Sequence, residues 1–170
     1  MSQNDTRGDS RAGSAPLAAR RGSSARGGGG LRANALAAVV MLLLEYGLGI
    51  WVNLYAQIPA GDHGKGTFAA FGAAVAHGPA ALGVHAVLGT LLLVTAIALI
   101  VRAALAKKAA AAVTGAIAFL ATVAAWLSGA RFVGDAADGA SFGMAIATGV
   151  ALLSYVVILS VPGLTEGPGR

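Results

Sequence analysis

The chain alternates between long apolar runs and short segments that carry proline, glycine or charged residues. Four apolar runs stand out, at about 35–55, 79–102, 109–131 and 141–161. Each has roughly the 20 apolar residues that a helix needs to cross about 30 Å of hydrocarbon. Because lipid offers the backbone no hydrogen-bond partners, such segments have to be helical. The pattern therefore predicts an all-α integral membrane protein with four spans.

The segments between the runs indicate how the spans are arranged. Residues 103–108 and 132–140 join the second span to the third and the third to the fourth. Connections this short place consecutive helices side by side and antiparallel. Glycine and alanine occur in every span and let helix backbones approach closely in lipid. We therefore expect an up-down four-helix bundle, and the longer connection, residues 57–78, predicts a short helix lying at the membrane interface.

The two ends of the chain differ from the spans. Residues 1–33 are rich in Gly, Ser, Ala and Arg and hold almost no bulky apolar side chains. Such a segment cannot bury enough apolar surface to offset its conformational entropy, so we expect a disordered tail. Residues 163–170, after Pro162, predict a second, shorter tail. The transmembrane domain is then residues 34–162.

The composition agrees with this architecture and narrows the chemistry. Only 11% of the residues are charged and 56% are hydrophobic, whereas soluble proteins carry about 25% charged residues. Cysteine is absent, which excludes disulfides, thiolate metal sites and cysteine nucleophiles. The sequence also contains no zinc-protease, phosphate-loop, nucleophile-elbow or dinucleotide-binding motif. We expect a protein without catalytic machinery of its own.

The basic residues predict the orientation of the spans. An even number of spans puts the N-terminal tail, the 103–108 connection and the C-terminus on one side. That side holds ten of the twelve basic residues, namely Arg7, Arg11, Arg20, Arg21, Arg26, Arg32, Arg102, Lys107, Lys108 and Arg170. The other side holds Lys65 and Arg131. This asymmetry predicts a bacterial plasma membrane protein with both termini in the cytoplasm. It also explains the net charge of +5 without a nucleic-acid partner, since basic residues beside a membrane favour anionic lipid.

Glu45 is a carboxyl residue near the middle of the first span. An ionised carboxylate at the bilayer centre costs at least about 2.5 kcal/mol, so its side chain is expected to face the bundle. Residues at similar depth that could partner it are Thr90, Thr122, Thr148 and Tyr155. One interpretation is a neutral carboxyl group whose hydrogen bond fixes the helix register. The alternatives are a proton-carrying or ligand-binding carboxyl group and a tolerated side chain that reaches toward the interface.

A second group of polar residues lies in the outer half of the predicted bundle. Asn53 lies eight residues after Glu45, a spacing that puts the two on nearly the same face of the helix. His85, Ser128 and Arg131 lie at comparable heights on the second and third spans. These residues form a cluster if the helix faces converge. His85 then either donates to a carbonyl or to Ser128 in a packed bundle, binds a cofactor or metal, or handles protons. Arg131 is a candidate ligand contact or an interfacial anchor.

Three stretches carry a resemblance to known proteins. LLLEYGLGIWVNLYAQIP, HGPAALGVHAVLGTLLL and AWLSGARFV resemble small four-span membrane proteins of high-GC bacteria over about residues 35–161, which implies the four-span fold and no particular activity. A fainter likeness is to one four-helix half of the haem A synthase family. That likeness implies a b-type haem with His85 as an axial ligand. Met144 stands where the family has a second histidine, and methionine can also be an axial haem ligand.

Three functions follow from these features. The leading hypothesis is a non-catalytic accessory or ligand-binding bundle. The first alternative is a b-type haem or quinone redox protein that uses His85, Met144 and Asn53. The second is a proton-coupled carrier subunit that uses Glu45, with Arg131 as a further candidate for proton or ligand contact. The lipid bilayer is the expected partner in every case, and a carrier of only four spans also needs a homo-oligomer or a larger membrane complex.

The topology can be tested directly. Reporter tags fused to either terminus should lie in the cytoplasm, and a tag inserted in the 57–78 connection should lie outside, because the basic residues favour that orientation. Protease protection and tag accessibility in intact cells measure both locations. Termini found on opposite sides of the membrane would contradict the four-span topology.

Overall fold

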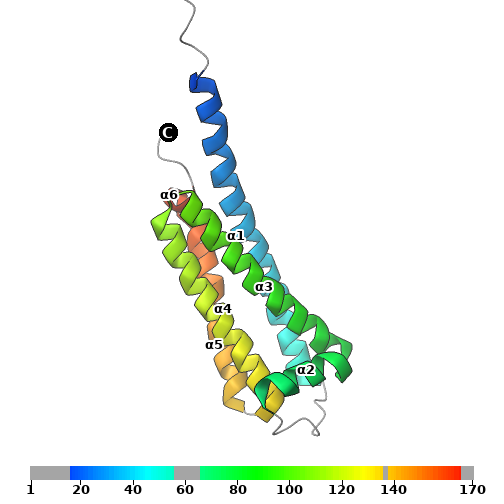
Figure 1. The fold of residues 1–170 in the computed structure, drawn as a ribbon. Helices are drawn as coiled ribbons and strands as arrows, with labels where there is room; N and C mark the ends of the chain where they lie inside the picture. Colours follow the sequence, from blue (N-terminus) through cyan, green and yellow to red (C-terminus); the bar gives the residue numbers. More distant parts are fainter. Residues whose placement is uncertain (1–15, 56–65, 136–137, 166–170) are drawn as a thin grey trace, which may run out of the picture.

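The structure is a computed structural model that describes residues 16–55, 66–135 and 138–165, and within these ranges all regular secondary structure is helical. The long helices are α1 (Pro16–Tyr55), α3 (Ala80–Leu105), α4 (Ala109–Asp135) and α5 (Asp138–Ser160), and the short ones are α2 (Thr67–His77) and α6 (Pro162–Thr165) (Figure 1). The prediction of an all-α bundle of four long helices is confirmed.

The four long helices each contain a stretch that is long and apolar enough to cross a membrane. Only 22% to 28% of the most apolar window of each span is buried inside the protein. Most large apolar side chains therefore point away from the bundle, for example Leu54, Val94 and Leu120. Such a surface is unfavourable in water and favourable in lipid. The chain is thus a multi-pass membrane protein.

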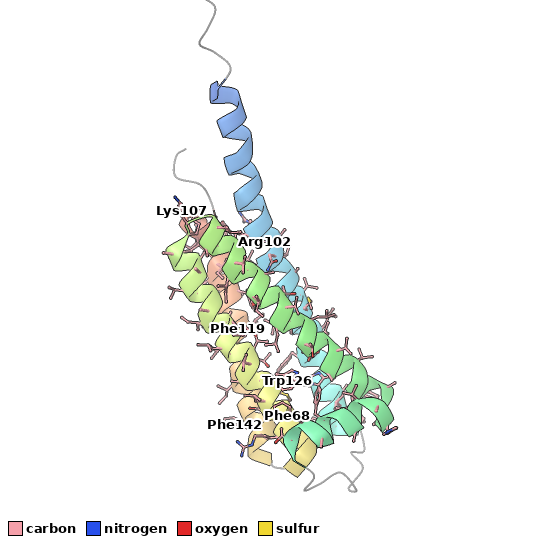
Figure 2. The ribbon with its side chains drawn as sticks, viewed as in Figure 1. Phe68, Arg102, Lys107, Phe119, Trp126 and Phe142 are labelled. Atoms are coloured by element: carbon pink, nitrogen blue, oxygen red, sulfur yellow. The ribbon has the colours of Figure 1, made fainter. Side chains whose placement is uncertain are left out.

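The spans follow each other around the bundle in chain order. Helix α1 packs against α3, α3 against α4 and α4 against α5, and a contact between α5 and α1 closes the ring. The first turn of α1, the α3–α4 turn and α6 lie toward one end of the molecule, while α2 lies at the other (Figure 1). Figure 2 labels Arg102 and Lys107 at the first end and Phe68 at the second. We call these the termini end and the α2 end.

A stripe of inward-facing residues, which we call the heptad seam, forms the core of the termini half. Its buried members are Leu31, Ala35, Ala38 and Leu42 on α1; Leu92, Ala96, Leu99 and Ala103 on α3; Ala111 and Ala118 on α4; and Ala151, Tyr155 and Ile158 on α5. On α1 and α3 the steps alternate between four and three residues, which keeps one face toward the neighbouring helix in a left-handed bundle. A Cβ at Gly115 would lie only 2.6 Å from Leu99 Cδ2. The backbones of α3 and α4 therefore approach closely here.

The same spacing continues into the α2 half of the bundle, but the residue types change. The seam positions there are Glu45, Gly49 and Val52 on α1; Leu82, His85 and Gly89 on α3; Ala125 and Gly129 on α4; and Met144 and Thr148 on α5. Glycine, alanine and polar residues thus replace many of the large apolar side chains. The helices keep their course, so this half of the bundle is less completely filled.

Side-chain hydrogen bonds to backbone carbonyls tie α1 to α3 in the termini half. Asn34 Nδ2 donates to the carbonyl oxygen of Thr95 at 3.0 Å. Arg102 Nη1 donates to the carbonyl oxygen of Gly30 at 3.3 Å. The pairing runs in opposite directions along the two helices, as antiparallel packing requires, and fixes their register.

The N-terminal boundary of the first helix differs from the sequence-based one. The tail was expected to extend to residue 33, whereas α1 begins at Pro16 and runs through the four glycines at 27–30. Proline suits a first helical turn because its φ is already fixed there. Glycine costs about 1 kcal/mol relative to alanine inside a helix, but extending an existing helix gains one hydrogen bond per residue. Residues 1–15 of the expected tail lie outside the described residues.

The helix predicted between the first two spans is confirmed as α2. At its end Gly78 donates its N–H to the carbonyl oxygen of Ala74 at 2.8 Å. A Cβ at Gly78 would collide with that same oxygen, so only glycine fits this turn. Helix α3 starts directly after Pro79. The tight turn lays α2 across the end of the bundle, against α3 and α4 (Figure 1).

Candidate functional site

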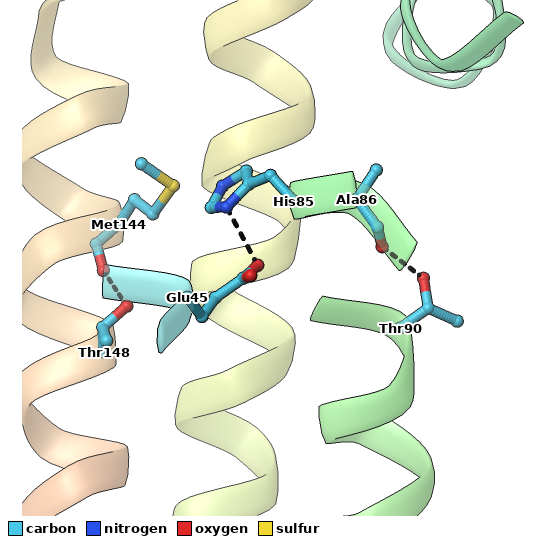
Figure 3. Close-up of polar contacts among 6 residues, drawn as sticks. All are labelled: Glu45, His85, Ala86, Thr90, Met144 and Thr148. Atoms are coloured by element: carbon cyan, nitrogen blue, oxygen red, sulfur yellow. Dashed lines mark hydrogen bonds and ion pairs between the residues drawn. The ribbon is translucent and has the colours of Figure 1, made fainter. Parts of the chain in front are cut away.

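Glu45 and His85 meet between α1 and α3 in the α2 half of the bundle (Figure 3). Glu45 Oε1 lies 3.1 Å from His85 Nδ1, and the two side chains are only 12% and 17% exposed. This is an ion-pair distance, although the N–H direction does not meet the requirements of a hydrogen bond. Because the surroundings are apolar, each group stabilises the other far more than it would in water. The two side chains therefore act as one polar unit inside the bundle.

Two glycines make room for this pair in a reciprocal way. A Cβ at Gly49, four residues after Glu45, would lie 3.2 Å from His85 Cε1. A Cβ at Gly89, four residues after His85, would lie 2.9 Å from Glu45 Oε1. Each polar side chain thus rests on the glycine that follows its partner on the neighbouring antiparallel helix. Larger residues at 49 or 89 would force the side chains to move.

A cavity of about 180 Å³ adjoins the pair. Its wall is formed by residues from α1, α2, α3, α4 and α5. Most of the wall is apolar, and the polar side chains in it include Glu45, His85, Asn53 and Trp126. The cavity is a direct consequence of the small residues at the seam positions, since Gly49, Gly89, Ala125 and Gly129 all line it.

Three polar atoms in the wall are buried without a hydrogen bond to any described residue, namely Glu45 Oε2, Trp126 Nε1 and His85 Nδ1. His85 Nδ1 faces Glu45 Oε1, which leaves Glu45 Oε2 and Trp126 Nε1 as the two without a polar partner. The hydroxyls of Thr122 and Thr148 do not donate to Glu45 Oε2, because each donates its hydrogen to a carbonyl of its own helix at 2.8 Å. An unsatisfied buried donor or acceptor costs about 1–3 kcal/mol. The cavity therefore presents one free donor and one free acceptor in an apolar setting.

Aromatic residues form the wall toward α2. The ring centroids of Phe71 and Trp126 are 4.9 Å apart, and those of Phe68 and Trp126 are 6.1 Å apart. Figure 2 places Phe68 and Trp126 at the α2 end of the bundle. The tight turn after α2 thus brings two phenylalanines against the indole that lines the cavity.

Met144 approaches the site from α5. In Figure 3 its thioether extends from α5 toward the imidazole of His85. A Cβ at Gly129 would lie 3.3 Å from Met144 Sδ, so the side chain also packs closely against α4. The other imidazole nitrogen, His85 Nε2, makes no hydrogen bond within the described part of the chain. It is the ring nitrogen left for a ligand.

The structure brings together four of the five residues that the sequence put forward for a site. Glu45, His85, Asn53 and Met144 all line the cavity, and Asn53 Oδ1 accepts a hydrogen bond from Ser141 Oγ at 3.4 Å. Arg131 is exposed and does not line the cavity. Whether any of these residues binds a cofactor or carries a proton stays a prediction.

The expected partners of Glu45 are not its partners in the structure. Thr90 donates to the carbonyl oxygen of Ala86 at 2.8 Å, and the hydroxyls of Thr122 and Thr148 are bonded to their own helices in the same way. Tyr155 belongs to the core of the termini half. The partner is His85, because the antiparallel register of α1 and α3 that pairs Asn34 with Thr95 also puts residue 85 opposite residue 45.

Sequence reasoning missed Trp126, Phe71 and Gly89 as parts of the site. A signal for Gly89 was present, because Glu45 and His85 are each followed four residues later by glycine. When two neighbouring antiparallel helices each carry a polar residue followed four positions later by glycine, each polar side chain can pack on the glycine of the other helix. No signal located Phe71, because its position depends on the angle at which α2 crosses the bundle.

The Glu45–His85 interaction can be measured with a double-mutant cycle. Glu45→Gln, His85→Gln and the double variant should show a coupling free energy of about 0.6 kcal/mol, the average for polar pairs between membrane helices, and up to about 1.7 kcal/mol. Reversible unfolding in bicelles provides the stabilities. As a control, Glu45→Gln combined with Thr90→Val should be additive, since the Thr90 hydroxyl is bonded to its own helix. Additivity in the Glu45/His85 cycle would show that the two side chains do not interact.

Comparison with known proteins assigns no family to the chain. No protein-family model, curated protein or solved structure matches it. In the described ranges no group of three or more His, Asp or Glu side chains is placed to hold a metal ion. Inferences about function therefore rest on the cavity and on the polar atoms in its wall.

Proposed function

We propose that this protein is a non-catalytic membrane bundle that binds a small, largely apolar ligand in the cavity between its spans. The observation that carries the proposal is that Glu45 Oε2 and Trp126 Nε1, in the wall of a largely apolar cavity, have no polar partner among the described residues. Buried polar groups in proteins almost always have a partner. A ligand with a polar group at one end would supply it.

The size of the cavity limits the ligand. Its volume is about 180 Å³, and an apolar cavity of about 150 Å³ is enough for benzene. Pockets for drug-sized molecules are larger, at about 300–1,000 Å³. The cavity therefore suits a single ring or a short chain, either as a whole molecule or as the head of a longer lipid-soluble one.

The surroundings supply the recognition. Phe71 and Trp126 offer aromatic faces, which bind rings favourably, and Gly89 and Gly129 also line the cavity. The Glu45–His85 pair gives one wall of the cavity a fixed polar group. Since lipid-soluble molecules concentrate in the bilayer, a cavity within the spans samples them directly.

Filling the cavity should abolish binding. Ala125 lines the cavity, whereas its neighbour Ala124 is exposed, so Ala125→Leu and Ala124→Leu are a matched pair. In a Trp51→Phe background Trp126 is the single tryptophan, and bromobenzene should quench its fluorescence saturably. Quenching should lose its saturable part in Ala125→Leu and keep it in Ala124→Leu. Equal quenching of the two variants would contradict binding in this cavity.

A b-type haem at His85 is the second candidate. The observation in its favour is that Glu45 lies at His85 Nδ1 while Nε2 is without a hydrogen bond in the described residues. Histidines that bind metals commonly have a carboxylate at the other ring nitrogen. Met144 would be the residue that supplies a second axial ligand. The volume of about 180 Å³ is small for a macrocycle, so haem ranks below a smaller ligand.

The absorption spectrum tests the haem candidate. Protein produced with ample haem should show a Soret band that is lost in His85→Ala and kept in His77→Ala, because His77 is exposed at the end of α2. Spectra of the detergent-purified variants measure this. Protein that stays colourless after reconstitution with haem would remove this candidate.

A further inference from the structure

We propose that the ligand of the cavity is a ring with a hydroxyl group, of the phenol or hydroquinone class, whose hydroxyl accepts from Trp126 Nε1 and donates to Glu45 Oε2. This inference rests on the proposed function and names the chemical class of its ligand. It follows from the positions of the two unpartnered atoms and from what each can bond.

The carboxyl group of Glu45 and the indole of Trp126 both approach Gly89. From the point where a Cβ of Gly89 would stand, Glu45 Oε1 is 2.9 Å away and Trp126 Cδ1 is 3.7 Å away. Cδ1 is bonded to Nε1 within the indole ring, so the N–H edge of the indole and the carboxylate border the same small space. Residue 89 has no side chain that would separate the two groups, and all three residues line the cavity.

The bonding capacities of the two groups select the ligand group. The indole N–H only donates, and a carboxylate only accepts. A carbonyl or ether oxygen would satisfy the indole and leave Glu45 Oε2 without a partner. An ammonium group would satisfy the carboxylate and leave the indole without one. A hydroxyl group does both with one oxygen and one hydrogen.

The rest of the cavity selects a ring. Phe71 and Trp126 present aromatic surfaces whose centroids are 4.9 Å apart, and the volume of about 180 Å³ is slightly larger than the roughly 150 Å³ that holds a benzene molecule. The added volume is suited to one or two ring substituents. A hydroxyl attached directly to the ring puts the polar atom of the ligand at the edge of its apolar part. This matches the cavity, where the polar atoms of Glu45 and Trp126 lie beside an aromatic wall.

A matched pair of probes tests this assignment. Calorimetric titration of the full-length protein in detergent with 4-butylphenol and 4-butylanisole compares a hydroxyl with its methyl ether on the same ring. The phenol should bind at least about tenfold more tightly, because the ether leaves the buried carboxylate oxygen unsatisfied. In Trp126→Phe, which lacks the N–H donor, the preference should fall severalfold. Trp51→Phe should retain it, since Trp51 lies on the exposed side of α1.

Each outcome is decisive for one of the two proposals. Equal binding of phenol and anisole would overturn the hydroxyl assignment and leave ligand binding in the cavity intact. Tighter binding of benzyltrimethylammonium than of the phenol would overturn it in favour of a cation. Absence of saturable binding for all three probes would overturn the proposed function itself. The comparison of the probes uses the unmodified protein, so it tests the hydroxyl assignment even if Trp126→Phe does not fold.

Discussion

The packing of Glu45 and His85 across the seam between α1 and α3 is the interaction on which the α2 half of the bundle depends. Lipid can satisfy neither group, so each has to find its partner inside the protein. The pair fits only because Gly49 and Gly89 leave space for the imidazole and the carboxylate. Together with the Asn34–Thr95 and Arg102–Gly30 hydrogen bonds in the other half, it holds α1 and α3 in one register along their length.

The same requirement explains why the bundle has a filled half and a hollow half. In the termini half the heptad seam carries alanine, leucine and isoleucine, and the small residues of one helix accommodate the larger ones of the next. In the α2 half the seam has to hold a polar pair, which lies between α1 and α3. The residues that face the pair from α4 and α5 are small or have flexible side chains. A volume of about 180 Å³ is then left between them. The cavity is thus the space that remains when a polar pair takes the place of apolar side chains in an otherwise regular seam.

Helix α2 turns this space into a candidate binding site. The Gly78 turn directs α2 across the bundle, where Phe71 meets Trp126 and covers part of the cavity. The indole of Trp126, through its Cδ1 atom, then comes close to Gly89, which the carboxyl group of Glu45 also approaches. The polar pair, the small seam residues and helix α2 therefore all border the same cavity. These three features come from separate parts of the sequence. That convergence underlies the proposal of a ligand with both an apolar ring and a polar atom.

The sequence by itself determined the membrane architecture. Four runs of about 20 apolar residues leave helices as the only solution in lipid, and Pro79, Pro162 and the short connections set the limits of the last three helices to within a few residues. It also singled out Glu45 and His85, because ionisable residues at such depth are costly. Their contact, however, depended on the register of α1 against α3, which is set by hydrogen bonds between the helices and by the room that Gly49 and Gly89 leave. The roles of Phe71 and Trp126 depended on the angle of α2 and on the rotation of α4, and neither leaves a periodic signal in the chain. Local pattern therefore fixed which segments are helices, whereas the relative positions of helix faces, and with them the site, were decided only when all the helices packed together.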